Sequence, residues 1–568
     1  MDQAESPARS SRLAGQAPMA LLAMAIGALI PVMVTSSLDV PSWSLRQSLL
    51  PIIAVVGLWQ LVALYRTELR RSALVATAFG AWCVVSALAS PVPSVAIWGL
   101  YGIGTGLVFV LALIGAWAIG ACVGHRGRTL VQDALLFGVL ANSALAVIQM
   151  VIPNGPGVLG LFQGRSDGFM GNPVYLAELL AGGWWLVASR FAAKPALWAI
   201  PAIAVAAGLQ DSGSRFGLIV LALAVIVGFV AFRRRIALAL LGLAVVGTLA
   251  GTGLAHLNGG TTSSARVGTD SGVTARIDSW LSARHSVARR PILGEGPGTY
   301  LAATAPYHPL GMARTEGPDK LFGGAHNILV EYTVTTGIPG ILLLLAWFIL
   351  ILRRSGWRDP LAGFALGMLA VHLAEPQLVF TTPLAFLALG GAVALRTPPD
   401  PVVPRPARAI LGAGAVAATV VLIVGSVQYK NARLSESVAQ AKSAIGLMPA
   451  WYQPRLQLAQ DYLFLGDTRN DPSYRTLAVR AYLQAIAVDP AEPQLWIGLA
   501  GIESKLGHPT QAINYYRQAL TKNPWSRLAL ESLVKVENQT GNTAAAHHFE
   551  AKALMLPHPS GDVASTPG

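Results

Sequence analysis

Long apolar runs, separated by short polar connections, recur along most of the chain. Thirteen of these runs come close to or exceed the roughly 20 helical residues that cross the hydrocarbon core of a bilayer. They lie near residues 18–36, 49–65, 73–90, 102–123, 132–152, 173–189, 195–209, 216–232, 236–254, 327–352, 360–375, 379–395 and 409–427. The pattern predicts an all-α fold in which residues 1–428 form a polytopic bundle of about 12 to 13 transmembrane helices.

A different pattern, with large and small residues at fixed spacings, begins near Tyr429. Small residues at such positions let two short helices approach closely, and stacked helix pairs then share one core. The clearest unit holds Trp496, Leu499, Ala500, Gly507, Ala512, Tyr516, Ala519 and Pro524. Units on either side repeat the spacing, which resembles that of the tetratricopeptide repeat. We therefore predict a tetratricopeptide-like helical-repeat domain over residues 429–559, followed by a disordered tail at 560–568.

The repeats predict an architecture and leave the role of the domain open. A groove that binds a partner protein and a spacer that stiffens one face of the molecule fit the pattern equally well, because a repeat architecture does not specify a ligand. In either role, we expect a soluble solenoid to share little apolar surface with a membrane bundle.

Lysine and arginine are distributed unevenly between alternate connections of the predicted bundle. The N-terminus and one set of short connections hold 18 of them, whereas the alternate set holds only Arg46, Arg165 and Arg215. Connections rich in these residues stay in the cytoplasm, so the asymmetry predicts a cytoplasmic N-terminus. Thirteen spans then place the long loop at about 256–325 and the repeat domain on the extracytoplasmic side.

The formal net charge of +13 follows largely from this topology signal. No RNA- or DNA-binding motif accompanies it, so we expect no nucleic-acid partner. The two cysteines, Cys83 and Cys122, fall within predicted spans. We therefore expect neither a disulfide framework nor a cysteine-based metal site.

Four polar motifs lie in the connections that are predicted to be extracytoplasmic. A lone arginine at a helix end usually marks a membrane boundary, but here three arginine motifs and one histidine motif share a face. In chain order they are the stretch from Gly164-Arg165 to Asn172-Pro173, the pair Ser214-Arg215, the stretch from Arg276 to Trp280, and His326-Asn327 followed after nine residues by Gly337-Ile338-Pro339-Gly340.

In this order the motifs resemble those of the O-antigen ligase and Wzy-type polymerase superfamily of bacterial membrane glycosyltransferases. The resemblance covers roughly residues 40–400, and some relatives also carry tetratricopeptide-like repeats. It implies a multi-pass protein of the bacterial cytoplasmic (inner) membrane. Such a protein moves a glycan from a polyprenyl diphosphate carrier to an acceptor hydroxyl on the extracytoplasmic face. The resemblance also implies that neither a nucleotide, nor a metal, nor another cofactor takes part.

The chemistry of such a transfer matches these residue types. Guanidinium groups bind phosphate oxygens bidentately and keep their charge near lipid. Arg165, Arg215 and Arg276 are therefore candidates to bind the diphosphate, and Arg215 and Arg276 are also candidate catalytic residues that stabilise the leaving group. Histidine titrates near neutrality, and His326 is the candidate general base for the acceptor hydroxyl.

Polar side chains within about two turns of the outer ends of predicted spans are further candidates, because ionisable groups at that depth are usually functional. An ion pair that locks two spans together is the competing interpretation. On an expected helix, His372 and Glu375 can pair locally, whereas Glu331 lies about 140° around its helix from His326 and is not expected to pair with it. The candidate substrate-binding residues are Arg165, Asn172, Asn327, Glu178, Glu331 and Glu375.

Other classes of protein explain the sequence less fully. A secondary transporter, the more distant alternative, would place polar residues near the bilayer midplane in repeated halves. A scaffold would leave the histidine and the arginines without a role. Within the enzyme class, the sequence does not separate an O-antigen ligase from a Wzy-type polymerase or a protein O-oligosaccharyltransferase. The acceptor is therefore left open among a glycan, a lipid and a protein.

Overall fold

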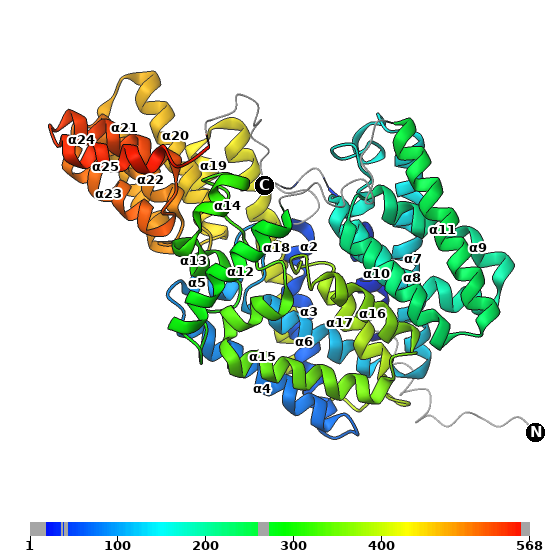
Figure 1. Cartoon of the computed structure of the whole chain (residues 1–568). Helices are drawn as coiled ribbons and strands as arrows, with labels where there is room; N and C mark the ends of the chain where they lie inside the picture. Colours follow the sequence, from blue (N-terminus) through cyan, green and yellow to red (C-terminus); the bar gives the residue numbers. More distant parts are fainter. Residues whose placement is uncertain (1–18, 36–37, 39–43, 259–271, 558–568) are drawn as a thin grey trace, which may run out of the picture.

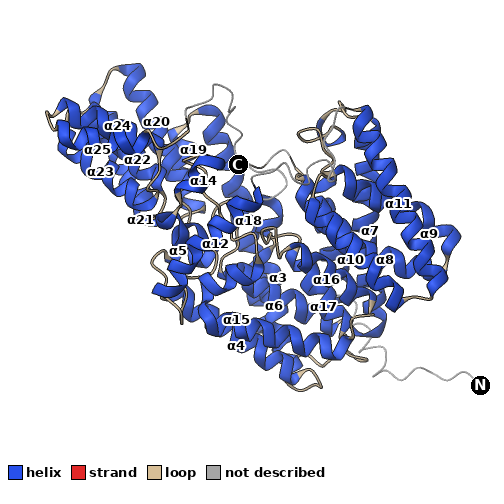
Figure 2. Ribbon diagram, viewed as in Figure 1, coloured by secondary structure: helices blue, strands red, loops and turns tan. Residues whose placement is uncertain are grey.

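The structure, a computed structural model, describes residues 19–35, 38, 44–258 and 272–557 (Figure 1). These residues form helices joined by turns and loops (Figure 2), and no strand is present among them. The one β-type contact in this part of the chain is an isolated bridge between Phe162 and Arg165. The predicted all-α fold is therefore confirmed.

A helix lies at each of the thirteen predicted apolar runs. In chain order these helices are Met19–Val32, α3 (Leu50–Leu64), α4 (Arg70–Leu88), α6 (Leu107–Cys122), α7 (Gly124–Val151), α8 (Pro173–Ala193), α9 (Pro195–Asp211), α10 (Arg215–Ala231), α11 (Arg234–Leu257), α15 (Ile328–Ser355), α16 (Pro360–Val371), α17 (Thr382–Ala392) and α18 (Arg405–Ser435). Among the described residues, six helices are both long and apolar enough to cross a membrane, namely Ser44–Leu64, Arg70–Leu88, Gly124–Val151, Arg234–Leu257, Ile328–Ser355 and Arg405–Ser435. The total of about 12 to 13 spans stays a prediction.

The centre of the membrane region is α6, which is buried around almost its whole circumference. It packs against α3 and α17, and glycines at the contacts let the helix backbones approach closely. A Cβ at Gly57 of α3 would lie 1.9 Å from the Cα of Gly115, and one at Gly390 of α17 would lie 2.1 Å from the carbonyl oxygen of Trp117. Only glycine fits at these two crossings.

Polar contacts between connections divide the membrane region into two faces. The site face is defined as the face at which residues 162–172, 211–215, 272–327 and 372–381 lie. On this face Arg276 forms an ion pair with Glu375, and on the opposite face Arg128 forms one with Asp359. Each pair joins connections that the predicted spans place on one side. The assignment of the two faces to the cytoplasm and the exterior stays a prediction.

Helix α15 is interrupted at Gly337, whose φ of 71° departs from helical geometry. Near the break, the carbonyl oxygen of Thr335 accepts a hydrogen bond of 2.8 Å from the backbone N–H of Gly296. A Cβ at Gly337 would lie 2.0 Å from the carbonyl oxygen of Ile292. The glycine that opens the Gly-Ile-Pro-Gly stretch therefore lets residues 291–298 of the long loop lie directly against the helix.

The long loop between α11 and α15 is largely folded. Its described part holds α12 (Gly272–Arg289), α13 (Tyr300–Thr304), the 3-10 turn η4 (Ala305–Tyr307) and α14 (Leu310–Thr315). The predicted start of the loop at residue 256 falls inside α11, and residues 259–271 lie outside the described part of the chain. Figure 1 shows α12–α14 between the membrane helices and the C-terminal helices.

The C-terminal region consists of short helices that pack in pairs around two apolar cores. These helices are α19 (Val438–Leu447), α20 (Gln453–Arg469), α21 (Pro472–Val488), α22 (Pro493–Lys505), α23 (Pro509–Lys522), α24 (Arg527–Gln539) and α25 (Thr543–Ala553). The small residues Ala512 and Ala519 are fully buried, as their packing role requires. The predicted boundary between residues 428 and 429 falls inside α18, which continues to Ser435, and it stays a prediction. The predicted tail at 560–568 lies outside the described residues.

The expectation that the repeats share little apolar surface with the membrane region is wrong. Trp451, in the turn before α20, is buried against the rings of Trp98 and Tyr101. Its indole N–H donates a hydrogen bond of 3.0 Å to the carbonyl oxygen of Gly99. A second apolar contact joins α14 to the last repeat helices. A tryptophan in a turn carries no sequence signal for the surface that it contacts, so the interface was missed.

Candidate functional site

His326 lies in the turn before α15, and its backbone adopts a left-handed conformation with a φ of 51°. Hydrogen bonds fix the residues on both sides of it. The N–H of Ala325 donates to Oε2 of Glu331 at 2.7 Å, and its carbonyl oxygen accepts from Nε1 of Trp280 at 2.7 Å. Asn327 caps α15 by accepting two backbone N–H groups of its first turn. A histidine held at positive φ is strained, and such strain concentrates at functional sites.

Three of the predicted residues meet at the site face. Nη2 of Arg276 lies 3.1 Å from both carboxylate oxygens of Glu375. Nδ1 of His326 lies 3.6 Å from Oε2 of the same carboxylate, which is longer than a hydrogen bond. Glu375 is buried, whereas 22% of the His326 side chain is exposed. Nδ1 is therefore the ring nitrogen that faces the carboxylate.

The expected local pair between His372 and Glu375 is not formed, because α16 ends at Val371 and the two residues do not share a helix. Instead, Nε2 of His372 lies 2.9 Å from Oε1 of Glu178, and both side chains are almost fully buried. The same nitrogen lies 3.1 Å from Oγ1 of Thr382. This contact joins α8 to the end of α16, and a role for Glu178 in substrate binding stays a prediction.

Glu331 also has a local role in the structure. Its carboxylate accepts the backbone N–H of Ala325 and therefore supports the turn that holds His326. This contact agrees with the expectation that Glu331 does not pair with the His326 side chain within the helix. Its predicted role in substrate binding is separate from this contact and stays a prediction.

Two phenylalanines border the group of charged residues. The ring of Phe322 packs on the imidazole of His326 with a centroid distance of 4.9 Å. The guanidinium carbon of Arg276 lies 5.5 Å from the ring centroid of Phe216, a distance at which a cation interacts with the face of a ring. Phe216 follows Arg215, the first residue of α10. The structure therefore brings the Arg215 and Arg276 motifs together on the site face.

The motif around Arg165 is tied to the end of α9. The backbone N–H and the hydroxyl of Ser166 both donate to Oδ2 of Asp211, at 3.0 and 2.5 Å. The guanidinium of Arg165 interacts electrostatically with the same carboxylate. At the other end of the motif, Asn172 caps α8 by accepting the N–H of Val174 at 2.9 Å. Asn172 therefore has the same capping role as Asn327, and substrate binding by either amide stays a prediction.

Arg46 is a buried arginine that sequence reasoning counted only toward topology. Its Nη2 donates to the carbonyl oxygen of Phe169 at 2.7 Å, and its guanidinium carbon lies 4.6 Å from the ring centroid of Phe380. It thereby joins α2 (Ser44–Ser48) to the turn that follows Arg165. The sequence did carry a signal for this contact. An arginine in a connection that is predicted to be extracytoplasmic departs from the positive-inside bias and needs a partner within the protein.

The turn after Arg165 gives a prediction for the pH dependence of stability. Burial raises the pKa of Asp167 to about 6, although hydrogen bonds from Gln149 and the backbone lower it. The folded state therefore binds this proton more tightly than the unfolded state. The stabilisation that this proton gives the folded state is present at low pH and is lost as the pH rises from 3.8 to about 6. Asp167→Asn removes the charge and keeps an oxygen that accepts from Gln149. We expect its melting temperature near neutral pH to exceed that of the wild type by about 2–4 °C.

Thermal unfolding in detergent at several pH values tests this expectation. The advantage of Asp167→Asn should disappear below the low end of the window, where the aspartate is protonated in both folded and unfolded states. Asp133→Asn, at a half-exposed ion pair on the opposite face, is the control and should change the melting temperature little. Identical melting curves for Asp167→Asn and the wild type across the window would contradict the prediction.

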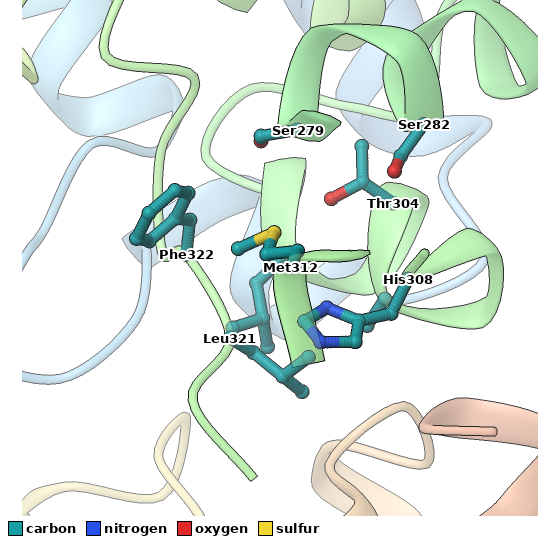
Figure 3. A pocket seen from close by; sticks show the side chains of 9 residues that line it. Ser279, Ser282, Thr304, His308, Met312, Leu321 and Phe322 are labelled. Carbon is teal, nitrogen blue, oxygen red and sulfur yellow. The ribbon is translucent and has the colours of Figure 1, made fainter. Parts of the chain in front are cut away.

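A small pocket lies next to Phe322, between α12, α13 and α14. The hydroxyls of Ser279, Ser282 and Thr304 and the imidazole of His308 line it (Figure 3). Within the described residues, Nε2 of His308 is buried without a hydrogen-bond partner. Burial lowers the pKa of His308 to about 4, so the imidazole is neutral at pH 7. The free volume of about 10 Å³ suits a single water molecule and is too small for a sugar.

Comparison with known proteins agrees with the two-part organisation. Residues 200–345 match a family model described as O-antigen ligase, and residues 493–536 match one described as tetratricopeptide repeat. The first range includes Arg215, Arg276 and His326. No curated protein matches the chain. A crystal structure of MamA is similar at 17% identity over 26% of this chain and 82% of that chain, with a TM-score of 0.21. A second MamA structure is similar at 16% identity over 27% and 91%, again with a TM-score of 0.21.

These matches agree with the resemblance found in the motifs. The O-antigen ligase range extends from α9 into α15 and so contains the long loop and the turn of His326. The tetratricopeptide range contains α22, α23 and most of α24. The chain is thus a multi-pass membrane protein whose central part is similar to O-antigen ligases and whose C-terminal part is similar to tetratricopeptide repeats.

Proposed function

We propose that the protein transfers a glycan from a polyprenyl diphosphate carrier to an acceptor hydroxyl at the outer face of the bacterial cytoplasmic membrane. The observation that supports this most directly is the grouping of Arg276, Glu375 and His326, with Glu375 within 3.6 Å of both partners. Transfer from a diphosphate needs a cation for the leaving group and a base for the acceptor. Arg276 and His326, which supply these groups, both lie in the range that is similar to O-antigen ligases.

In this proposal the diphosphate of the donor displaces Glu375 from Arg276. A guanidinium binds phosphate and carboxylate through the same fork of N–H groups, and a diphosphate carries the greater negative charge. Arg215 begins α10 and adds a second guanidinium at the positive end of a helix. Arg165 extends the positive charge along the site face. The arginines stabilise the charge that develops on the diphosphate as its bond to the sugar breaks.

Displacement of Glu375 also acts on His326. Before displacement the carboxylate already lies 3.6 Å from Nδ1, and once released from Arg276 it orients the imidazole and stabilises the imidazolium that forms. Nε2 takes the proton of the acceptor hydroxyl, and the acceptor oxygen forms a bond to the anomeric carbon. The bond from that carbon to the diphosphate breaks, and the polyprenyl diphosphate leaves with the electron pair. A single displacement of this kind inverts the anomeric centre.

The same chemistry serves an O-antigen ligase, a Wzy-type polymerase and a protein O-oligosaccharyltransferase, which differ in their acceptor. Mass analysis of glycoconjugates tests the proposal and identifies the acceptor. Cells that lack the protein should lose one class of glycan-modified lipid, polysaccharide or protein, and should accumulate the glycan on its polyprenyl diphosphate carrier. Cells that make His326→Gln at equal membrane abundance are the matched control. They should show the same loss of glycoconjugate and the same accumulation on the carrier as cells that lack the protein. Unchanged glycoconjugates and an unchanged carrier pool in both strains would refute the proposal.

A further inference from the structure

The contact between α14 and the repeats leads to one further conclusion, which rests on the proposed function. We infer that the C-terminal repeats position the catalytic turn, by holding residues 310–322 of the long loop on α23–α25. These residues are named the docking segment. The last residue of the docking segment, Phe322, packs on the ring of His326. The repeats are therefore a positioning part of the active site.

The first half of the docking segment binds the repeats through an apolar contact. Ala313 of α14 and Leu530 of α24 are fully buried, and Leu556, after α25, is 6% exposed. The partly buried side chains packed on this cluster are Leu310, Leu520, Trp525, Phe549 and Ala553. This cluster adjoins the second core of the repeats, because Leu520 and Phe549 pack against both. Ala313 and Leu310 come from the docking segment, so the cluster is complete only while this segment lies on the repeats.

Hydrogen bonds extend the contact along the chain toward the site. Nε of Arg314 donates to the carbonyl oxygen of Met555 at 2.8 Å. From the repeats, Nδ2 of Asn523 donates to the carbonyl oxygen of Pro318 at 2.9 Å, and the hydroxyl of Ser526 donates to Oδ1 of Asp319 at 2.6 Å. Asn523 and Ser526 are both buried. Buried hydrogen bonds of this kind fix the register of the two partners, because breaking one leaves a polar group unsatisfied.

The docking segment lies next to α12, which carries Arg276, and next to the turn that holds His326. On one side, Met312 of α14 lines the small pocket together with Ser279 and Ser282 of α12, the helix that carries Arg276 (Figure 3). On the other side, only two residues separate Asp319 from Phe322. No helix is assigned from Glu316 through Asn327, so contacts with other parts of the protein must hold this stretch. Movement of the docking segment would therefore move Phe322 and loosen the turn of His326.

A second attachment fixes the repeats themselves. The indole of Trp451 packs in the membrane region, and α18 continues from that region into the first repeats. The solenoid is thus held at its start by Trp451 and contacts the docking segment at its end. A simple spacer needs only the first attachment. Two attachments that bracket the catalytic loop are what a positioning element requires.

The test separates positioning from chemistry in the full-length protein, reconstituted in lipid nanodiscs. Leu556→Asp places a charge in the apolar contact, Leu556→Met is the conservative variant, and Leu483→Asp, on an exposed residue of α21, is the matched control. Three quantities are measured for each: hydrogen exchange of residues 316–327, kcat and KM for the lipid-linked donor, and equilibrium binding of polyprenyl diphosphate. Should Leu556→Asp accumulate poorly, Ser526→Ala removes only the hydrogen bond to Asp319 and is measured in the same way.

We expect faster exchange in residues 316–327 of Leu556→Asp, with no change in α20–α22. The kcat should fall about 10- to 100-fold, as for a misplaced catalytic group, while polyprenyl diphosphate binds within about twofold of the wild type. Leu556→Met and Leu483→Asp should match the wild type. A normal kcat in Leu556→Asp despite faster exchange would overturn the inference, and so would unchanged exchange. A wild-type protein that neither binds polyprenyl diphosphate nor transfers glycan would instead refute the proposed function, and the exchange data would still test the docking contact.

Discussion

Replacing His326 with glutamine should reduce glycan transfer by about 10²–10⁴-fold while binding of the polyprenyl diphosphate donor is retained. Glutamine can form a hydrogen bond but cannot take a proton from the acceptor hydroxyl at neutral pH. In the proposed mechanism the arginines hold the donor, and Arg276 lies on a different element from His326. The measurement is kcat for transfer by the purified protein, with donor binding measured separately by titration.

The strained backbone of His326 calls for a control of its own. A residue change at a φ of 51° alters the turn as well as the chemistry. Asparagine adopts this conformation more readily than most residues, so His326→Asn preserves the turn and removes the base. We expect His326→Asn to melt at the wild-type temperature and to be as inactive as His326→Gln. Transfer by His326→Gln at near the wild-type rate would remove the histidine from the mechanism.

In that event the carboxylates are the remaining candidates for the base, and the structure ranks them. Glu178 is paired with His372 in the interior, and Glu331 accepts the backbone N–H of Ala325. Glu375 contacts both Arg276 and His326, and in the proposed mechanism the donor releases it from Arg276. Glu375 is therefore the second choice for the general base, and Glu375→Gln would be the variant to measure next.

Hydropathy predicted where helices lie and was less informative about where they begin and end. Helix α7 begins at Gly124, eight residues before the predicted run, because its first turns are polar. Helix α18 extends beyond its apolar run at both ends for the same reason. Helix ends are set by caps and by glycine or proline rather than by hydropathy. The ends that had a visible cap, at Asn172 and Asn327, were predicted within a residue.

The motifs predicted that Arg276 and His326 lie on one face, whereas the pairing of the charged residues could not be predicted. Arg276 and Glu375 are 99 residues apart, and nothing in the sequence indicates which of several carboxylates a given arginine meets. The prediction that His372 pairs with Glu375 was wrong, because residues three apart share a helix face only while the helix continues. The docking of α14 on the repeats was missed because its small apolar residues resemble any short amphipathic helix. Long-range pairing depends on tertiary geometry, which spacing along the chain does not encode.

The second large loss of activity is expected when Arg276 is replaced. Arg276→Lys keeps the charge but replaces a planar fork by a single ammonium, which cannot bind two phosphate oxygens in the same geometry. Loss of such a group in a transition-state site typically costs about 10²–10³-fold in kcat. We expect a loss of this size together with weaker donor binding, and a similar change in Arg215→Lys. Arg284→Lys, at an exposed position on the same helix, is the matched control and should be fully active.

The interpretation depends on separating phosphate binding from the ion pair with Glu375. Arg276→Ala leaves that buried carboxylate without its cation and should destabilise the protein by about 3–5 kcal/mol, which a melting curve would detect. Arg276→Lys retains a cation near Glu375, so its melting temperature should stay close to that of the wild type. A lysine variant that folds normally and is inactive therefore assigns the loss to the diphosphate. Full activity in both lysine variants at equal membrane abundance would exclude the phosphate-binding role, because a purely structural ion pair tolerates lysine.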